Sequence, residues 1–142
     1  AAAAALRDKI GRASLERRIL LLGSFEEQAL AAEYDRARLF VLPSHFEGYG
    51  MAFAEALAHG LPVVGCAGGA VSATVPAETG ILVPPGDASA LAEALRWLLS
   101  DPTEFARRAE AAWKHAERLP RWRDTAAVIA HVLTEAKAEP FV

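Results

Sequence analysis

Several features that mark other protein classes are scarce in this sequence. Cys66 is the one cysteine in 142 residues, which argues against a disulfide framework and favours a reducing compartment such as the cytoplasm. No apolar run approaches the ~20 residues that span a membrane. The formal net charge of −3 provides no basic surface for nucleic acid. We therefore expect a cytoplasmic protein without a transmembrane segment or a nucleic-acid partner.

Apolar residues make up 53% of the chain, enough for the core of one compact domain. Short apolar runs of strand length alternate with segments of helical character. The runs cover residues 19–22, 39–42, 62–65 and 80–83, and helices are expected over 1–15, 26–37, 50–59 and 122–136, after Asp87 and after Asp101, with a helical turn at 70–75. This alternation predicts an α/β fold with a doubly wound parallel sheet, in which all four runs are buried strands.

Three turns are expected at the carboxyl ends of strands, where parallel sheets bind ligands. They cover residues 43–50, 65–69 and 23–25. We therefore expect these turns to converge on one edge of the sheet.

The stretch from Pro43 to Val64 carries the clearest chemical signal. Its helix begins at a Gly-Tyr-Gly turn, where unpaired backbone N–H groups and the positive end of the helix dipole form an anion site. Glu47 precedes the turn, and Glu55 lies in a helix that is apolar on most faces, so we expect Glu55 to be buried and hydrogen-bonded. A diphosphate on the N–H groups and a diol on a carboxylate would suit a sugar nucleotide. The alternative is a solvated Glu47 and a Glu55 that belongs only to the core.

The stretch S-x-x-E-G-Y-G-M-x-x-x-E-A-L-A-x-G-x-P-V-V resembles the donor-site motif of retaining GT-B glycosyltransferases, specifically glycosyltransferase family 4. That motif has two glutamates separated by seven residues, as Glu47 and Glu55 are. The resemblance implies that Glu47 is the catalytic-site acid beside the transferred sugar and that Glu55 binds the ribose. It also implies that the backbone of the next residues holds sugar and phosphate oxygens, namely Gly48, Tyr49, Gly50 and Met51.

Other segments extend the resemblance. L-L-L-G-S-F is similar to the strand and turn beside the nucleobase, which makes Gly23, Ser24 and Phe25 candidate donor contacts. Phe25 has an alternative role as a hydrophobic staple for the following helix. The family often has an acid near residues 72–74, where this chain has Ser-Ala-Thr, so no contact is carried over there.

The resemblance also indicates what these residues lack. The family's donor domain, a Rossmann-like sheet, begins with two further strands and a basic pair that meets the diphosphate, and neither is visible here. We expect residues 1–120 to form a partial sugar-nucleotide-binding domain, and residues 121–142 a helix and tail that pack toward an absent N-terminal domain. The last helix is expected to bury its apolar positions, which are Trp122, Ala126, Ile129 and Leu133.

The resemblance implies transfer of a sugar from a nucleotide sugar to an acceptor with retention of configuration, as in glycan biosynthesis. The acceptor, a sugar, lipid or other glycan, would be held by the absent domain, so these residues alone should be inactive. No cofactor is expected, and His45 and His59 lack a third ligand for a metal. Peripheral membrane association through other parts of the protein is left open. Two alternatives remain: a non-catalytic nucleotide-sugar-binding or interaction module, and a related GT-B enzyme such as a sugar-nucleotide epimerase.

Overall fold

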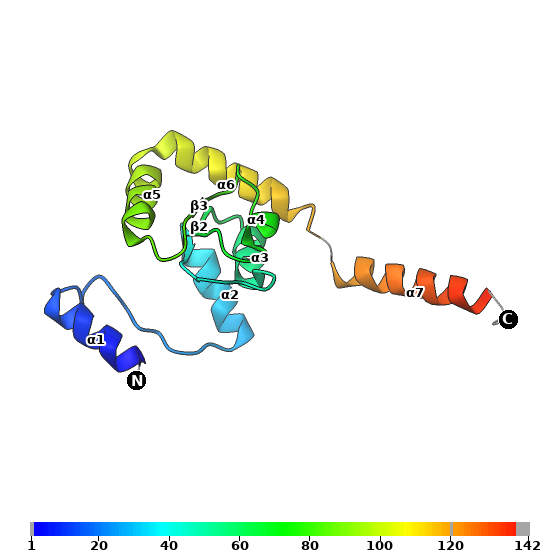
Figure 1. Cartoon of the computed structure of the whole chain (residues 1–142), viewed down its shortest axis with the longest axis horizontal. Coiled ribbons are helices and arrows are strands. Elements are labelled where there is room, and N and C mark those ends of the chain that lie inside the picture. Colours follow the sequence, from blue (N-terminus) through cyan, green and yellow to red (C-terminus); the bar gives the residue numbers. More distant parts are fainter. Residues whose placement is uncertain (1, 120, 139–142) are drawn as a thin grey trace. The chain divides into compact units, whose positions relative to one another are not determined.

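The computed structural model describes residues 2–119 and 121–138 of this chain. The chain divides into two compact units, residues 1–33 and residues 34–142, and each is described by itself. Figure 1 shows the order of helices and strands along the chain.

The first unit contains helix α1, Ala2–Arg12, an extended segment and the start of helix α2, Glu27–Arg36. The residues of α2 from Tyr34 onward belong to the second unit. The prediction of a buried strand at residues 19–22 is wrong. These residues have no regular secondary structure, and Leu20 is 73% exposed. A strand needs a neighbour for its backbone N–H and C=O groups, and this run has none among the described residues.

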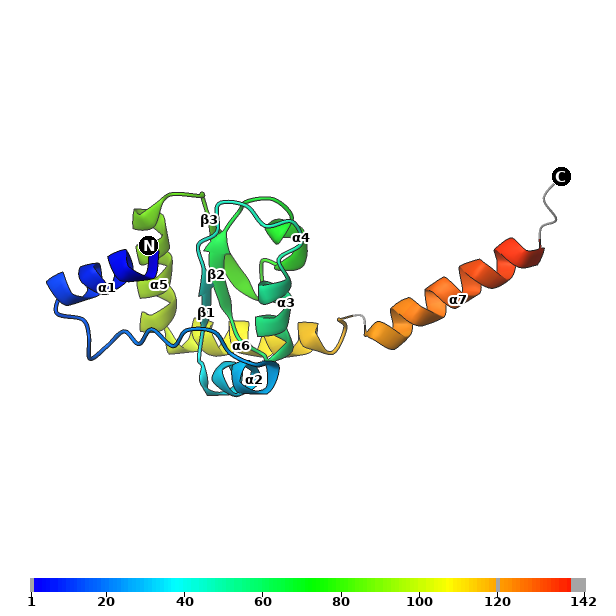
Figure 2. The ribbon, with the colours of Figure 1, turned by 90° about the horizontal axis from the view of Figure 1, so that it is seen from below.

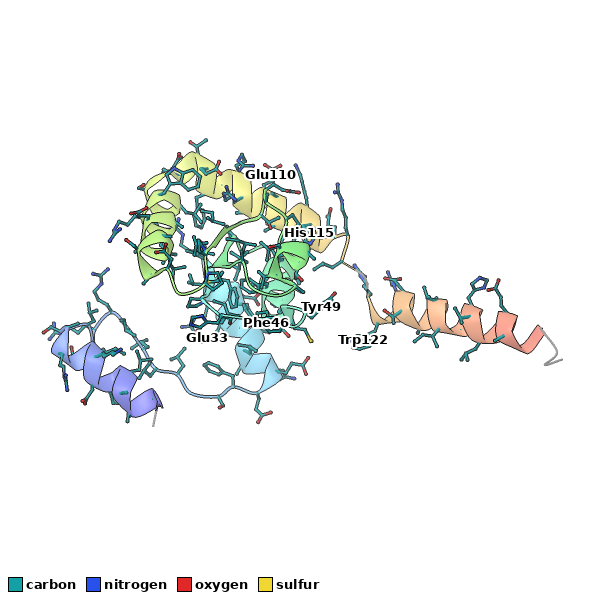
Figure 3. All side chains as sticks on the ribbon, in the orientation of Figure 1. Glu33, Phe46, Tyr49, Glu110, His115 and Trp122 are labelled. Atoms are coloured by element: carbon teal, nitrogen blue, oxygen red, sulfur yellow. The ribbon has the colours of Figure 1, made fainter. Side chains whose placement is uncertain are left out.

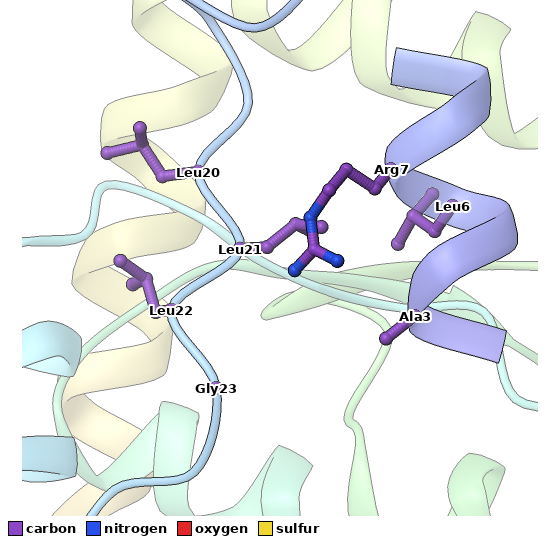
Figure 4. A pocket seen from close by; sticks show the side chains of 7 residues that line it. All are labelled: Ala3, Leu6, Arg7, Leu20, Leu21, Leu22 and Gly23. Carbon is purple, nitrogen blue, oxygen red and sulfur yellow. The ribbon is translucent and has the colours of Figure 1, made fainter. Parts of the chain in front are cut away.

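The segment nevertheless keeps the alternating side-chain directions of an extended chain. Figure 4 shows Leu21 on the side of α1, toward Leu6, whereas Leu20 and Leu22 point to the other side. Together with Ala3, Arg7 and Gly23, these residues line a hollow of about 360 Å³. The apolar pattern that suggested a strand is therefore present, but without a sheet around it.

The second unit is built on a parallel sheet. The strands are β1, Phe40–Leu42; β2, Val63–Cys66; and β3, Gly80–Val83, in the order β1-β2-β3. Phe40 pairs with Val63, and Val63 pairs with Gly80. Three of the four predicted strands are confirmed, and their parallel pairing confirms the α/β class. The prediction that each strand is buried holds throughout only for β2, because Val41 of β1 is exposed and the middle residues of β3 are half-buried.

Helices cover both faces of this sheet. Helix α3, Met51–Ala58, contacts β1 and β2, and α4, Val71–Thr74, packs beside α3. Helix α5, Ala88–Ser100, lies on the opposite face against β2 and β3, as Figure 2 shows. Helix α6, Pro102–Ala116, contacts both α3 and α5.

The helix ends follow the sequence signals. Asp87 caps α5 by accepting a hydrogen bond from the N–H of Ala90, and Asp101 caps α6 before Pro102 at the first helical position. Gly60 follows α3 with a φ of +71°, the left-handed conformation in which glycine commonly ends a helix. A Cβ on Gly60 would lie 2.7 Å from the ring of Trp113 in α6, so this glycine also permits close packing of α3 and α6.

The core lies between α3, the sheet and α6. Its buried members are Phe53, Ala56, Leu57, Leu61, Val63, Val71, Val75 and Ala112. Tyr34 and Phe40 pack against this cluster. Because α3 starts at the Gly-Tyr-Gly turn, the core positions that turn at the carboxyl ends of the strands.

Helix α7, Trp122–Ala138, does not bury the positions expected of it. Trp122, Ala126, Ile129 and Leu133 are all exposed. The periodic pattern correctly predicts the helix, but burial requires a partner that the pattern does not supply. Residues 139–142 of the expected tail lie outside the described residues. Docking of this helix on another domain stays a prediction.

Candidate functional site

Two loops that follow neighbouring strands join at the carboxyl edge of the sheet. Glu47, after β1, pairs in parallel with Gly69, after β2. The N–H of Ala70 donates to the carbonyl oxygen of Glu47 at 2.9 Å, and the N–H of Glu47 donates to the carbonyl oxygen of Gly68 at 3.4 Å. The expected convergence of the loops after β1 and β2 is therefore confirmed.

The two glycines after β2 allow the two loops to pack closely at this junction. A Cβ on Gly68 would collide with the carbonyl oxygen of His45, and a Cβ on Gly69 would collide with that of Glu47. Gly69 also has a φ of +67°, which favours glycine. These glycines therefore let one loop lie directly on the other.

Gly50 provides the turn into α3. Its φ is +83° and its carbonyl oxygen accepts hydrogen bonds from the N–H groups of Phe53 and Ala54 at 3.0 and 3.1 Å. A left-handed residue at this position strongly favours glycine. The turn is held from outside by Thr74 of α4, whose hydroxyl donates to the carbonyl oxygen of Tyr49 at 2.5 Å.

The N–H groups of five consecutive residues remain unpaired at this turn. Within the described part of the chain, none of Gly48, Tyr49, Gly50, Met51 and Ala52 donates a backbone hydrogen bond. Gly50 is a buried residue, whereas Gly48, Tyr49 and Met51 are exposed. Unpaired N–H groups at the start of a helix are suited to an anion.

Exposed side chains surround the turn. Tyr49 and Met51 are 64% and 63% exposed, and Phe46 on the preceding loop is exposed as well (Figure 3). The side chain of Glu47 has no hydrogen-bond partner among the described residues, and the residue is half-buried. The backbone of Glu47 is therefore held by Gly68 and Ala70, whereas no described residue holds its carboxylate.

The expectation that Glu55 is buried is wrong. Only one side of α3 is packed, with Phe53, Ala56 and Leu57 buried, whereas Glu55 is exposed. Met51 and Glu55 are four residues apart and therefore share a face of the helix. Glu55 thus lies on the exposed face that begins at the turn with the unpaired N–H groups.

Glu55 nevertheless has the hydrogen bond that its position in an apolar helix suggests. The hydroxyl of Tyr34, in α2, donates to Oε2 of Glu55 at 3.3 Å. Burial, together with the charge and hydrogen bond of Glu55, raises the pKa of Tyr34. Neither Tyr34 nor Thr74 lies in a sequence motif that would have identified it as a site residue.

The remaining candidate contacts belong to the first unit. Gly23, Ser24 and Phe25 are exposed, and Gly23 has a φ of +80°. These residues do not follow a strand, so the prediction that they lie at the carboxyl end of a strand is wrong. A contact of these residues with a nucleobase stays a prediction.

Among the described residues, no group of three or more His, Cys, Asp or Glu side chains could hold a metal ion. No helix in residues 2–119 and 121–138 is long and apolar enough to cross a membrane.

Known proteins resemble this chain in both sequence and structure. Glycogen synthase of Mycobacterium tuberculosis is 37% identical over 117 residues, which are 82% of this chain and 28% of that protein. Sucrose-phosphate synthase of Thermosynechococcus elongatus matches with a TM-score of 0.82 and 31% identity over 94% of this chain and 34% of that one. The HepE protein of Anabaena in complex with UDP-glucose matches with a TM-score of 0.79 and 27% identity. The match covers 94% of this chain and 36% of that one.

These similarities define the fold and the family. The three-stranded parallel sheet with its helices matches the C-terminal domains of GT-B glycosyltransferases. The chain spans about a third or less of the length of relatives such as glycogen synthase and sucrose-phosphate synthase. Residues 1–101 match the family described as glycosyl transferases group 1, and the chain belongs to that family.

Proposed function

We propose that this chain is the donor-binding part of a retaining glycosyltransferase of family 4. It would bind a nucleotide sugar at the carboxyl edge of its sheet, and the whole enzyme would transfer the sugar to an acceptor with retention of configuration. The single observation that carries this proposal is the run of unpaired N–H groups from Gly48 to Ala52 at the start of α3.

These N–H groups suit a diphosphate. They are consecutive, they lie at the positive end of the α3 dipole, and the left-handed Gly50 turns the backbone there. As the bond between sugar and phosphate breaks, negative charge grows on the phosphate oxygens. Fixed N–H dipoles would stabilise that charge without reorganising, which is electrostatic catalysis. The proposal assigns no residue to a metal.

Two carboxylates would hold the rest of the donor. Glu55 lies on the exposed face of α3 that starts at the turn, where it would accept hydrogen bonds from the ribose hydroxyls. Glu47 immediately precedes the unpaired N–H groups, and it would lie beside the transferred sugar. A carboxylate only accepts hydrogen bonds, which matches the hydroxyls of both sugars.

The proposed reaction also needs a site for the acceptor, which we assign to another domain. An N-terminal domain would hold the acceptor, and the chain alone would then be inactive. We place the enzyme in the cytoplasm, where nucleotide sugars would be its co-substrate. UDP-glucose is the first donor to test because the Anabaena HepE protein has been solved in complex with it.

The experiment replaces Glu55 by Gln in the full-length protein and measures the Kd for UDP-glucose by calorimetry. Gln keeps the shape of the side chain but loses its charge, and its NH2 group can only donate. We expect affinity to fall roughly ten- to a hundredfold, since a hydrogen bond to a charged group contributes about 1.5–3 kcal/mol. The Tm should change little because Glu55 is exposed.

Glu110→Gln is the matched control. Glu110 is also an exposed helical glutamate with one side-chain partner, Lys114 at 2.6 Å, and it lies in α6 away from the turn in sequence. This variant should bind UDP-glucose as the wild type does. A large drop in Tm for Glu55→Gln with an unaltered Kd in the folded fraction would remove Glu55 from the site.

A further inference from the structure

Four polar side chains connect helices α2 and α3. Tyr34 and Asp35 come from α2, and Glu55 and His59 come from α3. The Tyr34 hydroxyl donates to Oε2 of Glu55 at 3.3 Å, and Nδ1 of His59 lies 2.7 Å from Oδ1 of Asp35. The ring of His59 stacks on the ring of Tyr34, with centroids 5.1 Å apart and an interplanar angle of 21°.

The Tyr34 ring is fixed by its neighbours. His59 stacks on it. The ring of Phe40 in β1 is tilted against it, with the two ring centroids 5.9 Å apart. Phe40 in turn packs edge to face against the buried Phe53, with the ring centroids 5.6 Å apart. Because the ring is held by the core, the position of its hydroxyl is set before any ligand binds.

Glu55, in contrast, is an exposed side chain with three rotatable bonds. Such a side chain loses rotamer freedom when a ligand orders it, and that loss weakens binding. The Tyr34 hydroxyl already restricts the carboxylate through one acceptor position. A carboxylate has about four acceptor positions, so several remain for a ligand.

We propose that Tyr34 is a positioning residue for donor binding, whose hydroxyl holds the Glu55 carboxylate in the orientation that receives both ribose hydroxyls of the nucleotide. This inference rests on the proposed function, because it assumes that Glu55 binds the ribose. Asp35 has a supporting part, since its contact with His59 holds the imidazole ring against Tyr34.

A specific consequence follows for the sugar of the nucleotide. An oriented carboxylate accepts from two adjacent hydroxyls, whereas 2′-deoxyribose offers only one. Loss of the Tyr34 hydroxyl should therefore weaken binding of a ribonucleotide more than binding of its 2′-deoxy form. A merely structural role for Tyr34 would weaken both to the same extent.

The experiment measures the Kd of UDP and of 2′-deoxy-UDP for the full-length protein by calorimetry. The variants are Tyr34→Phe, Glu55→Gln and the double variant, with Ser100→Ala as a control that removes a hydroxyl bonded to Trp97 at the end of α5. For Tyr34→Phe we expect UDP affinity to fall about three- to tenfold, as for one hydrogen bond. The affinity for 2′-deoxy-UDP should change less than about twofold, and Ser100→Ala should bind both as the wild type does.

The double variant tests whether Tyr34 acts through Glu55. If it does, adding Tyr34→Phe to Glu55→Gln should cost little further UDP affinity, so the two effects are not additive. Additive effects would contradict action through Glu55. The Tm should stay close to that of the wild type in Tyr34→Phe, because Phe keeps both ring contacts.

The outcomes separate this inference from the proposed function. If Glu55→Gln leaves UDP affinity unchanged, both are overturned. If Glu55→Gln weakens UDP binding but Tyr34→Phe leaves the ratio of the two Kd values unaltered, only the inference is overturned. Equal weakening of both nucleotides with a lowered Tm also overturns it, in favour of a structural role.

A second measurement needs no ligand and no substitution of Tyr34. Ultraviolet absorbance follows the ionisation of tyrosine, and Glu55 is one cause of the raised pKa of Tyr34. Glu55→Gln should therefore lower the pKa of one tyrosine in the titration. An identical titration in both proteins would contradict the contact on which the inference depends.

Discussion

The hydroxyl of Thr74 donates a hydrogen bond of 2.5 Å to the carbonyl oxygen of Tyr49, 25 residues earlier in the chain. This bond ties α4 to the turn that precedes α3. The family often has an acid near this position, and here a neutral hydroxyl contacts the backbone of the candidate phosphate-binding turn. Thr74 therefore supports the turn from the side of α4.

Replacement of Thr74 by Val keeps the shape of the side chain and removes the hydroxyl. We expect the free energy of unfolding to fall by about 1 kcal/mol and UDP affinity to fall about two- to tenfold, because the turn loses one hydrogen bond. Calorimetry and thermal unfolding measure the two effects. Thr134→Val is the control, since it removes an exposed hydrogen bond to Ala130 within α7 and should not affect UDP binding. Unchanged UDP affinity in Thr74→Val would show that the turn does not need this support.

Gly50 and Gly48 form a matched pair for the glycine turn. A Cβ at Gly50 would make ordinary contacts, the nearest at 3.4 Å to Phe53, so the cost of Gly50→Ala comes from its φ of +83°. We expect this variant to lose about 1–2 kcal/mol of unfolding free energy and to bind UDP weakly, with its helical content nearly intact. Gly48→Ala should keep its stability, because a Cβ there meets nothing within 4 Å. Equal Tm values for the two variants would contradict a strained turn at Gly50.

We predict that the ionisation of Glu104 in α6 makes the free energy of unfolding depend on pH in the acid range. Hydrogen bonds from Arg107 at 2.7 and 2.6 Å and from Arg108 at 2.8 Å lower its pKa to about 2 from its ordinary value of 4.5. Above pH 4.5 its stabilising contribution is fully present. As the pH falls from about 4.5 to about 2, the unfolded chain binds a proton that the folded protein does not, and that contribution is lost.

Glu104→Gln should therefore lower stability at pH 7 and flatten its dependence on pH between about 4.5 and 2. Chemical denaturation at a series of pH values measures both. Glu110→Gln is the comparison, because one exposed lysine lowers the pKa of Glu110, and its effect should be smaller. A pH profile for Glu104→Gln that parallels the wild type would contradict this prediction.

Local features of this protein follow from the sequence alone. Gly50 and Gly60 adopt the left-handed conformations that their places at the ends of a short helix predict, and Asp87 and Asp101 cap the helices that follow them. The three strands and most helices begin and end within a few residues of their expected limits. These features depend on interactions between residues close in the chain, so a short stretch of sequence contains their cause.

Burial and pairing were decided only by the tertiary structure. Residues 19–22 have the composition of a strand, yet no strand forms, because backbone hydrogen bonds require a neighbour elsewhere in the chain. Glu55 lies in a helix whose sequence suggests burial on most faces, yet only one face is packed. Its partner Tyr34 is 21 residues away, and their meeting depends on how α2 and α3 pack against β1. Periodicity determines which residues share a face, whereas only the packing of elements determines what that face contacts.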